Sequence, residues 1–149
     1  MTSTMSVPDL GLDSRKLPDL TDPATRKRLS PAAIEAFFKI AENWDLRNED
    51  AMVLLGGASN GKYYGLKRSQ GGVLTQDELT RISLLIGIFK ALNILFNRKL
   101  ASQWVSRPNT NPLFNNAPPL AVIRSGIPGM IIVRRLLDGR RGGNFAEGM

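Results

Sequence analysis

One long apolar segment restricts the fold of this 149-residue chain more than any other feature. Residues 79–97 are mostly Leu, Ile, Phe and Ala, and the preceding Thr75 and Glu78 have the spacing of a capping box that opens a helix. A helix that is apolar on most sides must be covered by other elements. The segment therefore predicts a central core helix. Whether the chain covers this helix alone or a second copy contributes, as in a homodimer, stays open.

The remaining helix signals lie on both sides of this segment. Ser30-Pro31 is typical of a helix start, and Ile34, Phe37, Phe38 and Ala41 then form one apolar stripe. We expect this helix to end near Trp44. Further helices are predicted over 49–55, 59–68, 98–105, 118–125 and 131–137, with irregular structure over 106–117. No strand-like alternation of useful length is present, so the predicted fold class is all-α.

The composition excludes most catalytic sites. The chain has no histidine and no cysteine, and so lacks the usual zinc ligands, general base and thiol nucleophile. The acidic pairs Glu49-Asp50 and Asp77-Glu78 stand at expected helix starts, where the helix dipole favours them. We therefore expect a protein that is not an enzyme and that uses no cofactor and no metal.

The charge is distributed unevenly along the chain. The net charge is +7, and residues 1–50 hold 7 basic and 9 acidic side chains against 13 and 4 in residues 51–149. An excess of cations in the later part favours a polyanionic partner, although solubility alone would also explain it. Residues 1–25 are expected to form a flexible leader without a signal sequence. Charged residues interrupt the apolar segment over 79–97, so it is not expected to cross a membrane. A cytoplasmic protein without a membrane anchor is the simplest expectation.

Residues 49–68 have the layout of a helix-turn-helix. A short helix over 49–55 leads into Gly56-Gly57, and Ser59 can cap a second helix over 59–68. Such a second helix enters the major groove of DNA, with neighbouring cations on phosphates. The expected DNA-binding residues are Ser59, Asn60, Lys62, Tyr64, Lys67 and Arg68. Gly61 and Gly65 weaken the second helix, so a plain helical hairpin stays open as the alternative.

The C-terminal third carries a longer ordered pattern. It consists of Ala101, Trp104, Val105, Pro108-Asn109, Leu113, Pro119-Leu120, Gly126, Val133, Leu136 and Gly139. In this order the residues resemble the toxin-binding domain of Xre/MbcA/ParS-type antitoxins. The helices over 29–95 are similar in layout to the Xre-like half of the same antitoxins. Two segments depart from the family pattern: Phe114-Asn115-Asn116 replaces a glycine-containing turn, and Ile127-Pro128 stands where helix is usual.

The resemblance implies three regions: a leader over 1–25, an Xre-like helix-turn-helix region over 26–95, and a toxin-binding domain with a flexible tail over 96–149. It also implies two partners. One is a RES-type toxin that consumes NAD+, whose substrate entrance the C-terminal domain covers. The other is operator DNA, which the Xre-like half binds to repress the shared promoter as a homodimer or larger assembly.

The toxin-binding residues expected from this resemblance are the nearby cations Arg124, Arg134 and Arg135, together with Asn144, Phe145 and Glu147 of the tail over 140–149. Glu147 and the terminal carboxylate could enter a cationic NAD+ pocket as anion mimics; a disordered end is the alternative. Two other function classes stay open. One is a free-standing DNA-binding transcriptional regulator without a toxin. The other is a structural or RNA-associated basic domain.

Overall fold

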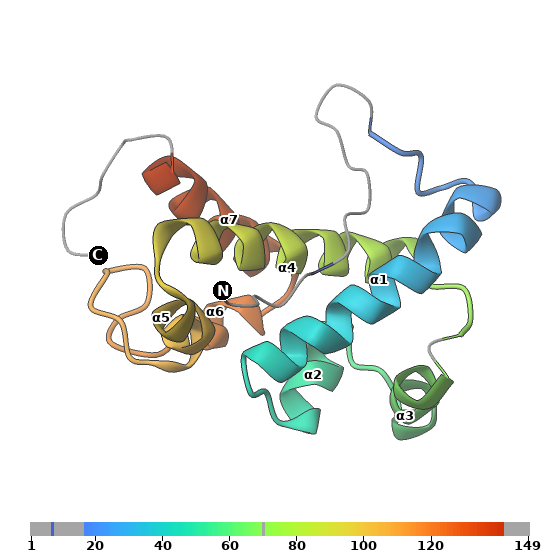
Figure 1. Cartoon of the computed structure of the whole chain (residues 1–149), viewed down its shortest axis with the longest axis horizontal. Helices are drawn as coiled ribbons and strands as arrows, with labels where there is room; N and C mark the ends of the chain where they lie inside the picture. The colour runs from blue at the N-terminus through green and yellow to red at the C-terminus, as the bar shows by residue number, and fades with distance from the viewer. Residues whose placement is uncertain (1–6, 8–16, 70, 142–149) are drawn as a thin grey trace.

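The computed structural model describes Val7 and residues 17–69 and 71–141, and within these ranges the chain is helical with connecting loops and no strand (Figure 1). The predicted all-α fold is confirmed. The elements are α1 Pro23–Asn43, α2 Asn48–Leu54, α3 Asn60–Ser69, α4 Gln76–Leu95, α5 Arg98–Gln103, the short 3-10 helix η1 Trp104–Ser106, α6 Leu120–Ile123 and α7 Ile127–Arg141.

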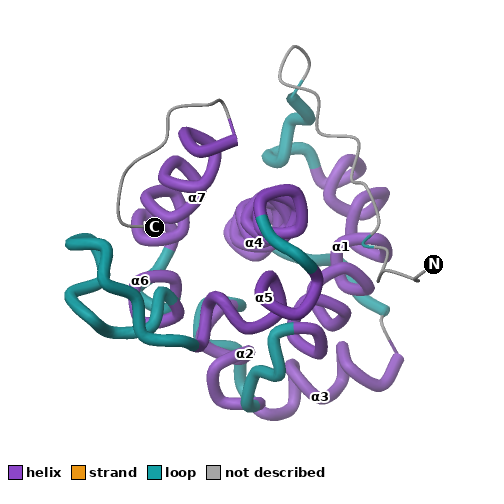
Figure 2. Tube along the Cα trace, turned by 60° about the vertical axis from the view of Figure 1, so that its left-hand side comes forward, coloured by secondary structure: helices purple, strands orange, loops and turns teal. Residues whose placement is uncertain are grey.

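Helix α4 is the centre of the molecule, as the apolar segment predicted. Its capping box is formed, because the Thr75 hydroxyl accepts from the Glu78 amide at 3.1 Å and the Glu78 carboxylate accepts from the Thr75 amide at 2.9 Å. Helices α1 and α7 pack against α4 from either side (Figure 2). The two halves of the chain therefore share one hydrophobic core rather than forming two separate ones.

Helix α1 begins earlier than predicted, so the helix start at Ser30-Pro31 is wrong. Asp22 caps the helix by accepting from the Ala24 amide, and Pro23 occupies the first helical position. The last three residues of the predicted leader, 23–25, therefore belong to α1. The predicted stripe is confirmed: Ile34, Phe37 and Ala41 are buried, and Phe38 packs partly buried against the core.

Pro31 lies inside α1, where a proline usually breaks a helix. The neighbouring Ser30 is fully buried, and its hydroxyl donates to the Arg26 carbonyl at 2.6 Å, one turn earlier. The same oxygen accepts from the Leu74 amide at 2.9 Å. Ser30 thus links α1 to the segment before α4 by hydrogen bonds, and it does not cap a helix as the following proline had suggested.

The C-terminal half begins as predicted. Asn97 caps α5 by accepting from the Leu100 amide at 2.9 Å, and Trp104 is buried with its ring edge-on to Phe114 at 5.7 Å between centroids. The loop over 107–119 is irregular, as expected. Asn115 and Asn116 adopt positive φ angles of 49° and 67°, a conformation that asparagine tolerates better than other side chains with a Cβ. They can therefore replace a glycine turn.

The last two helices differ from their predicted bounds. Helix α6 ends at Ile123, two residues before the predicted Ser125, and α7 runs over Ile127–Arg141 instead of 131–137. Gly126, with φ of +125°, makes the turn between them. Pro128 does not interrupt α7, because it stands in the first turn, where the helix requires no N–H from it.

No helix within the described residues is long and apolar enough to cross a membrane.

Candidate functional site

Helices α2 and α3 form the predicted helix-turn-helix. Gly56 and Gly57 between them have φ angles of +99° and +85°, which a residue with a Cβ rarely adopts. The amides of Gly57 and Ala58 both donate to the Met52 carbonyl, at 3.0 and 3.2 Å, and close the end of α2. The Ser59 hydroxyl accepts from the Lys62 amide at 3.2 Å and so caps α3, as predicted.

Two residues attach α3 to the rest of the molecule. Tyr63 and Leu66 are buried, as the sequence predicted for its inner face. The Tyr63 ring packs near Phe38, with 5.6 Å between centroids, and its hydroxyl donates to Asn48 Oδ1 at 2.9 Å. Burial raises the pKa of Tyr63 above its ordinary value, and the neighbouring Tyr64 adds to the rise.

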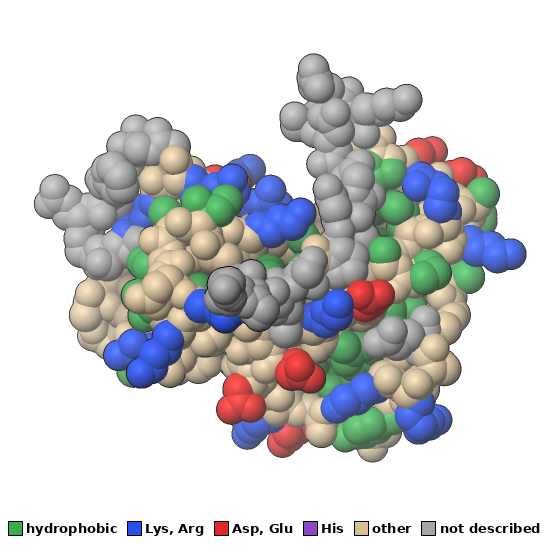
Figure 3. Space-filling view, in the orientation of Figure 1, with side chains coloured by type: hydrophobic (Ala, Val, Ile, Leu, Met, Phe, Trp, Pro, Cys, Tyr) green, Lys and Arg blue, Asp and Glu red, His purple; other side chains and the backbone are tan. Residues whose placement is uncertain are grey.

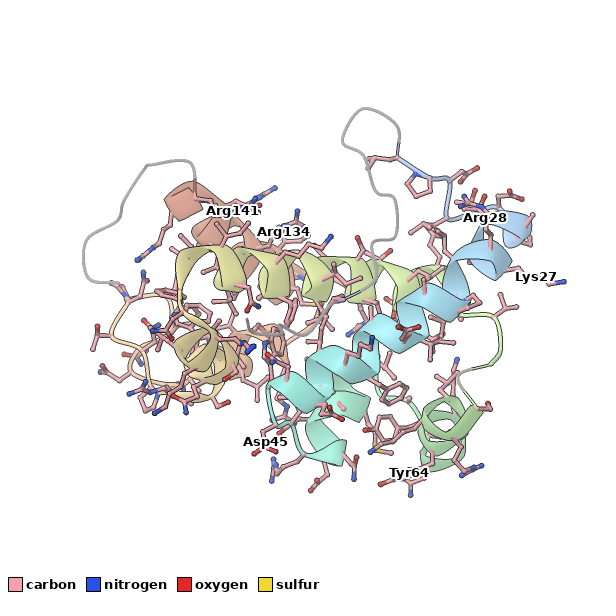
Figure 4. The ribbon with its side chains drawn as sticks, in the orientation of Figure 1. Lys27, Arg28, Asp45, Tyr64, Arg134 and Arg141 are labelled. Carbon is pink, nitrogen blue, oxygen red and sulfur yellow. The ribbon has the colours of Figure 1, made fainter. Side chains whose placement is uncertain are left out.

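The expected DNA-binding residues are all exposed: Ser59 caps α3, and the other five lie on the helix in two groups. Asn60, Tyr64 and Arg68 follow one another at four-residue spacing, and Tyr64 points away from the core (Figure 4). We call these three residues the outer ridge of α3. No ion pair joins Arg68 to another described residue.

The two lysines of α3 have partners within the chain. Lys62 Nζ lies 2.6 Å from Glu78 Oε2, in the capping box of α4. Lys67 Nζ donates to Asn48 Oδ1 at 3.2 Å and lies 5.8 Å from the centre of the Tyr63 ring. These lysines hold α3 in place relative to α2 and α4. Their phosphate-binding role remains a prediction.

The expected toxin-binding cations are not gathered at one place. Arg124, at the end of α6, pairs with Asp50 of α2, with 3.0 Å from Nε to Oδ1. Arg134 of α7 pairs with Asp138 at 3.2 Å, and its guanidinium lies against α4 so closely that a Cβ at Gly87 would overlap it. Arg135 is exposed. Asn144, Phe145 and Glu147 lie outside the described residues.

A basic surface follows α7. In the space-filling view, Lys and Arg side chains group beside this helix (Figure 3), and Arg134 and Arg141 lie there together (Figure 4). Asp138 pairs with both, since its second oxygen is 3.6 Å from Arg141 Nη1. The cations of this surface are therefore partly neutralised.

The predicted tail over 140–149 is wrong at its start, because Arg140 and Arg141 form the last turn of α7. Arg140 is buried, and its Nε and Nη2 atoms have no hydrogen-bond partner among the described residues. Burial lowers the pKa of its guanidinium from the ordinary value.

The role of Asp50 could not be predicted from its neighbours in the chain. This carboxylate is buried between two guanidiniums, Arg47 Nε at 3.1 Å and Arg124 Nε at 3.0 Å. The hydrogen bond and charge of Asp50, with a smaller contribution from Glu49, raise the pKa of Arg47. In the sequence, Asp50 appears only as an acid in the first turn of a helix, and in the structure it does occupy that position in α2. Its partner Arg124, at the end of α6, comes close to it only through the fold.

Comparisons with known proteins match two consecutive regions of the chain to two antitoxin domains. Residues 23–87 match the antitoxin Xre-like helix-turn-helix domain, and residues 91–143 match the antitoxin Xre/MbcA/ParS C-terminal toxin-binding domain. A protein of Sinorhizobium fredii (strain NBRC 101917 / NGR234), named "Uncharacterized protein y4oB", is 36% identical over 125 residues, which cover 83% of this chain and 95% of the relative. No solved structure matches significantly.

The first matched region ends within helix α4, and the second begins a few residues later in the same helix. Helix α1 of the first region and helix α7 of the second both pack against α4. A helix-turn-helix with an exposed second helix and a toxin-binding domain are thus present in one chain with one core. The chain belongs to the Xre/MbcA/ParS family of antitoxins, with an Xre-like helix-turn-helix domain followed by the family's toxin-binding domain.

Proposed function

We propose that this protein is the antitoxin of a RES-type toxin that consumes NAD+, that it inhibits the toxin by covering the substrate entrance, and that it represses its own operon. The observation that carries the proposal is the presence of both antitoxin domains in one chain. Occlusion needs a complementary surface and no reacting group, which suits a chain without histidine or cysteine.

For DNA, we propose that Asn60 and Tyr64 of the outer ridge of α3 meet base edges and sugars while Lys62, Lys67 and Arg68 meet phosphates. The exposure of Asn60, Tyr64 and Arg68 supports this assignment, as does the anchoring of the helix through Tyr63. Contacts to phosphates release counterions, so the affinity should fall steeply as salt is added. A homodimer would place two such helices on two half-sites.

The DNA part is tested by a gel shift with the chain's own upstream region at two salt concentrations. Arg68→Glu should weaken binding more than tenfold, because it places a negative charge against the phosphates. Lys99→Glu on α5 changes the net charge equally, away from α3, and is the matched control. Equal weakening by both variants would mean that only the total charge matters and that α3 does not bind DNA.

The toxin part is tested by a pull-down from the native host, followed by an NAD+-consumption assay with the captured protein. We expect a stoichiometric partner of toxin size, encoded in the adjacent reading frame, whose NAD+ consumption stops when this chain is added. Binding of the upstream DNA without any such partner would instead support the free-standing regulator.

The tail is tested separately. We propose that Glu147 enters a cationic pocket of the toxin as an anion mimic. Because α7 extends to Arg141, the deletion should remove residues 142–149 and leave the helix complete. Loss of inhibition with retained binding would support the proposal, and full inhibition by the shortened chain would refute it.

A further inference from the structure

Two cations near the start of α1 have no partner within the described part of the chain. Lys27 and Arg28 are both exposed, and neither side chain makes an ion pair or a hydrogen bond with a described residue (Figure 4). The preceding Arg26, in contrast, donates to the Leu20 carbonyl at 2.9 Å. Lys27 and Arg28 therefore contribute nothing visible to the fold and are available to a ligand.

Helical periodicity places Lys27 on the side of α1 that faces α3. Lys27, Ile34 and Phe38 follow one another at spacings of seven and four residues, so they share one face of the helix. The Phe38 ring lies near the Tyr63 ring of α3, with 5.6 Å between centroids. Lys27 thus continues, toward the start of α1, the face through which this helix contacts α3.

Arg28 lies on another face, although it is the next residue. Each residue advances around an α-helix by about 100°. Arg28 is in line with Glu35 and Lys39, at spacings of seven and four residues, and these two form an exposed ion pair at 3.0 Å. Arg28 therefore faces solvent beside this pair, while Lys27 faces the side of α3.

A hydrogen bond holds the segment after α3 against the start of α1. The Leu74 amide donates to the Ser30 hydroxyl at 2.9 Å, and only residues 70–73 separate Leu74 from the end of α3. Ser30 stands three residues after Lys27, and Lys67 and Arg68 lie in the last turn of α3. The start of α1 and helix α3 lie at the same end of the molecule (Figure 1), and cations are visible over both (Figure 3).

The acids that precede α1 are occupied by local hydrogen bonds. Asp22 accepts from the Ala24 amide and, at 2.9 Å, from the Thr25 hydroxyl, and so caps the helix. Asp19 accepts from the amide and the hydroxyl of Thr21. Neither carboxylate pairs with Lys27 in the described part of the chain, so the charge of Lys27 is not neutralised by a partner.

We propose that Lys27 contacts a DNA phosphate next to those contacted by the last turn of α3. The ligand is inferred from continuity with α3, since residues 23–87, which include Lys27, match a helix-turn-helix domain. When the second helix of such a motif lies in the major groove, cations beside it meet the sugar-phosphate backbone. The contact carries no base information, so it should raise the affinity for every sequence equally.

This inference rests on the proposed function, because it requires α3 to bind DNA, and it extends the interface from the helix-turn-helix to α1. The test measures the affinity of the full chain for its own upstream region over a series of salt concentrations. Lys27→Gln should weaken binding by roughly three- to tenfold near 0.1 M salt and should reduce the salt slope by about one counterion. A purely structural role would not change this slope.

The matched control is Arg28→Gln, which removes the same charge from the adjacent position. It should bind within twofold of the wild type and keep the wild-type salt slope. Equal weakening by Lys27→Gln and Arg28→Gln would overturn the inference, because only the total charge of α1 would then matter. The melting temperature of both variants should equal that of the wild type, since neither side chain has a partner among the described residues.

A second measurement compares the upstream region with an unrelated duplex of equal length. Lys27→Gln should leave the ratio of the two affinities unchanged, whereas Asn60→Ala should lower it. A wild-type salt slope in Lys27→Gln, or a changed affinity ratio, would overturn the inference. If Arg68→Glu still weakened binding in that case, the proposed DNA binding by α3 would stand. A wild-type chain that binds no DNA would overturn both.

Discussion

Helices α3 and α7 are both exposed on one side and both carry basic residues in the last turn, but they are attached to the molecule in different ways. Helix α3 buries two residues, Tyr63 and Leu66. Helix α7 buries Gly129, Met130, Val133, Leu137 and Arg140, and it packs along the central helix α4. Substitutions on the outside of α3 should therefore change ligand binding without changing the core. In α7, five of the fifteen positions are buried, so substitutions on its inner side change the core as well as the toxin-binding domain.

The largest effect is expected at Leu137, which is fully buried in α7. Leu137→Ala should lower the free energy of unfolding by about 2–5 kcal/mol, because it removes apolar contacts and leaves a cavity. Urea unfolding followed by circular dichroism measures the loss. Ile132→Ala on the exposed side of the same helix is the control, where a much smaller loss is expected. Equal losses would mean that α7 is not packed against the core as described.

The next effect is expected at Gly129, where α7 crosses α6. A Cβ at this position would overlap the carbonyl oxygen of Val122, and a backbone atom cannot move aside as a flexible side chain can. Gly129→Ala should therefore cost about 1–3 kcal/mol of stability. Gly139→Ala in the same helix meets no atom of the described residues within 4 Å, and it should keep or raise the melting temperature. A neutral Gly129→Ala would refute this close contact.

A smaller loss is expected for Tyr63→Phe in α3. The variant keeps the buried ring and removes the hydrogen bond to Asn48, which should cost about 0.5–1.5 kcal/mol at neutral pH. Asn48→Ala removes the same bond and also the acceptor of Lys67, and it should cost less in the Tyr63→Phe background than in the wild type. Full additivity would show that the hydrogen bond does not attach α3 to α2.

The same substitution should change the response to alkaline pH. The pKa of Tyr63 is raised in the folded state, chiefly by burial, so the unfolded chain loses this proton at a lower pH than the folded chain does. The stability that Tyr63 contributes is then present below the ordinary tyrosine pKa of about 10 and is lost as the pH rises through the raised value. Above pH about 10, the wild type should lose more stability than Tyr63→Phe. Parallel curves would contradict the raised pKa.

The smallest change in stability is expected at Gly65, and there the substitution should stabilise the chain. Gly65 lies within α3, and a Cβ added there meets no atom within 4 Å. Gly65→Ala should stabilise the chain by up to about 1 kcal/mol, because alanine favours the helix more than glycine does. The melting temperature should rise while DNA binding persists. A falling melting temperature would mean that α3 is more closely packed than its two buried residues suggest.

Local sequence signals predicted much of the fold. The capping box at Thr75 and Glu78, the cap at Asn97 and the glycine turn at Gly56-Gly57 are all present, because each depends on residues close together in the chain. The assignment of Tyr63 and Leu66 to the inside of α3 is also confirmed, because helical periodicity fixes which side chains share a face.

The start of α1 could not be chosen in the same way. Asp22-Pro23 and Ser30-Pro31 both have a capping residue followed by proline, so either could open a helix. The choice depends on Leu74, whose amide donates to Ser30 from 44 positions away. A buried serine that satisfies a distant amide looks, in sequence, like a serine that caps a helix.

Only part of the candidate site was predicted, because contacts between residues far apart in the chain cannot be inferred from local spacing. Spacing placed Asn60, Tyr64 and Arg68 on one exposed face, but it could not pair Lys62 with Glu78 or Arg124 with Asp50. The hollow that Asn43, Trp44 and Arg107 line was not predicted at all, because Asn43 and Trp44 stand more than 50 positions before Arg107 in the chain.

The sequence by itself determined the helical class, the capped starts of α4 and α5, the helix-turn-helix and the family. These depend on caps, turns and periodicity, which act over a few residues. Only the tertiary structure decided that α4 joins both halves in one core and that Asp50 lies between the guanidiniums of Arg47 and Arg124. Such pairings follow from how buried surfaces pack together, and packing brings residues into contact regardless of their separation along the chain.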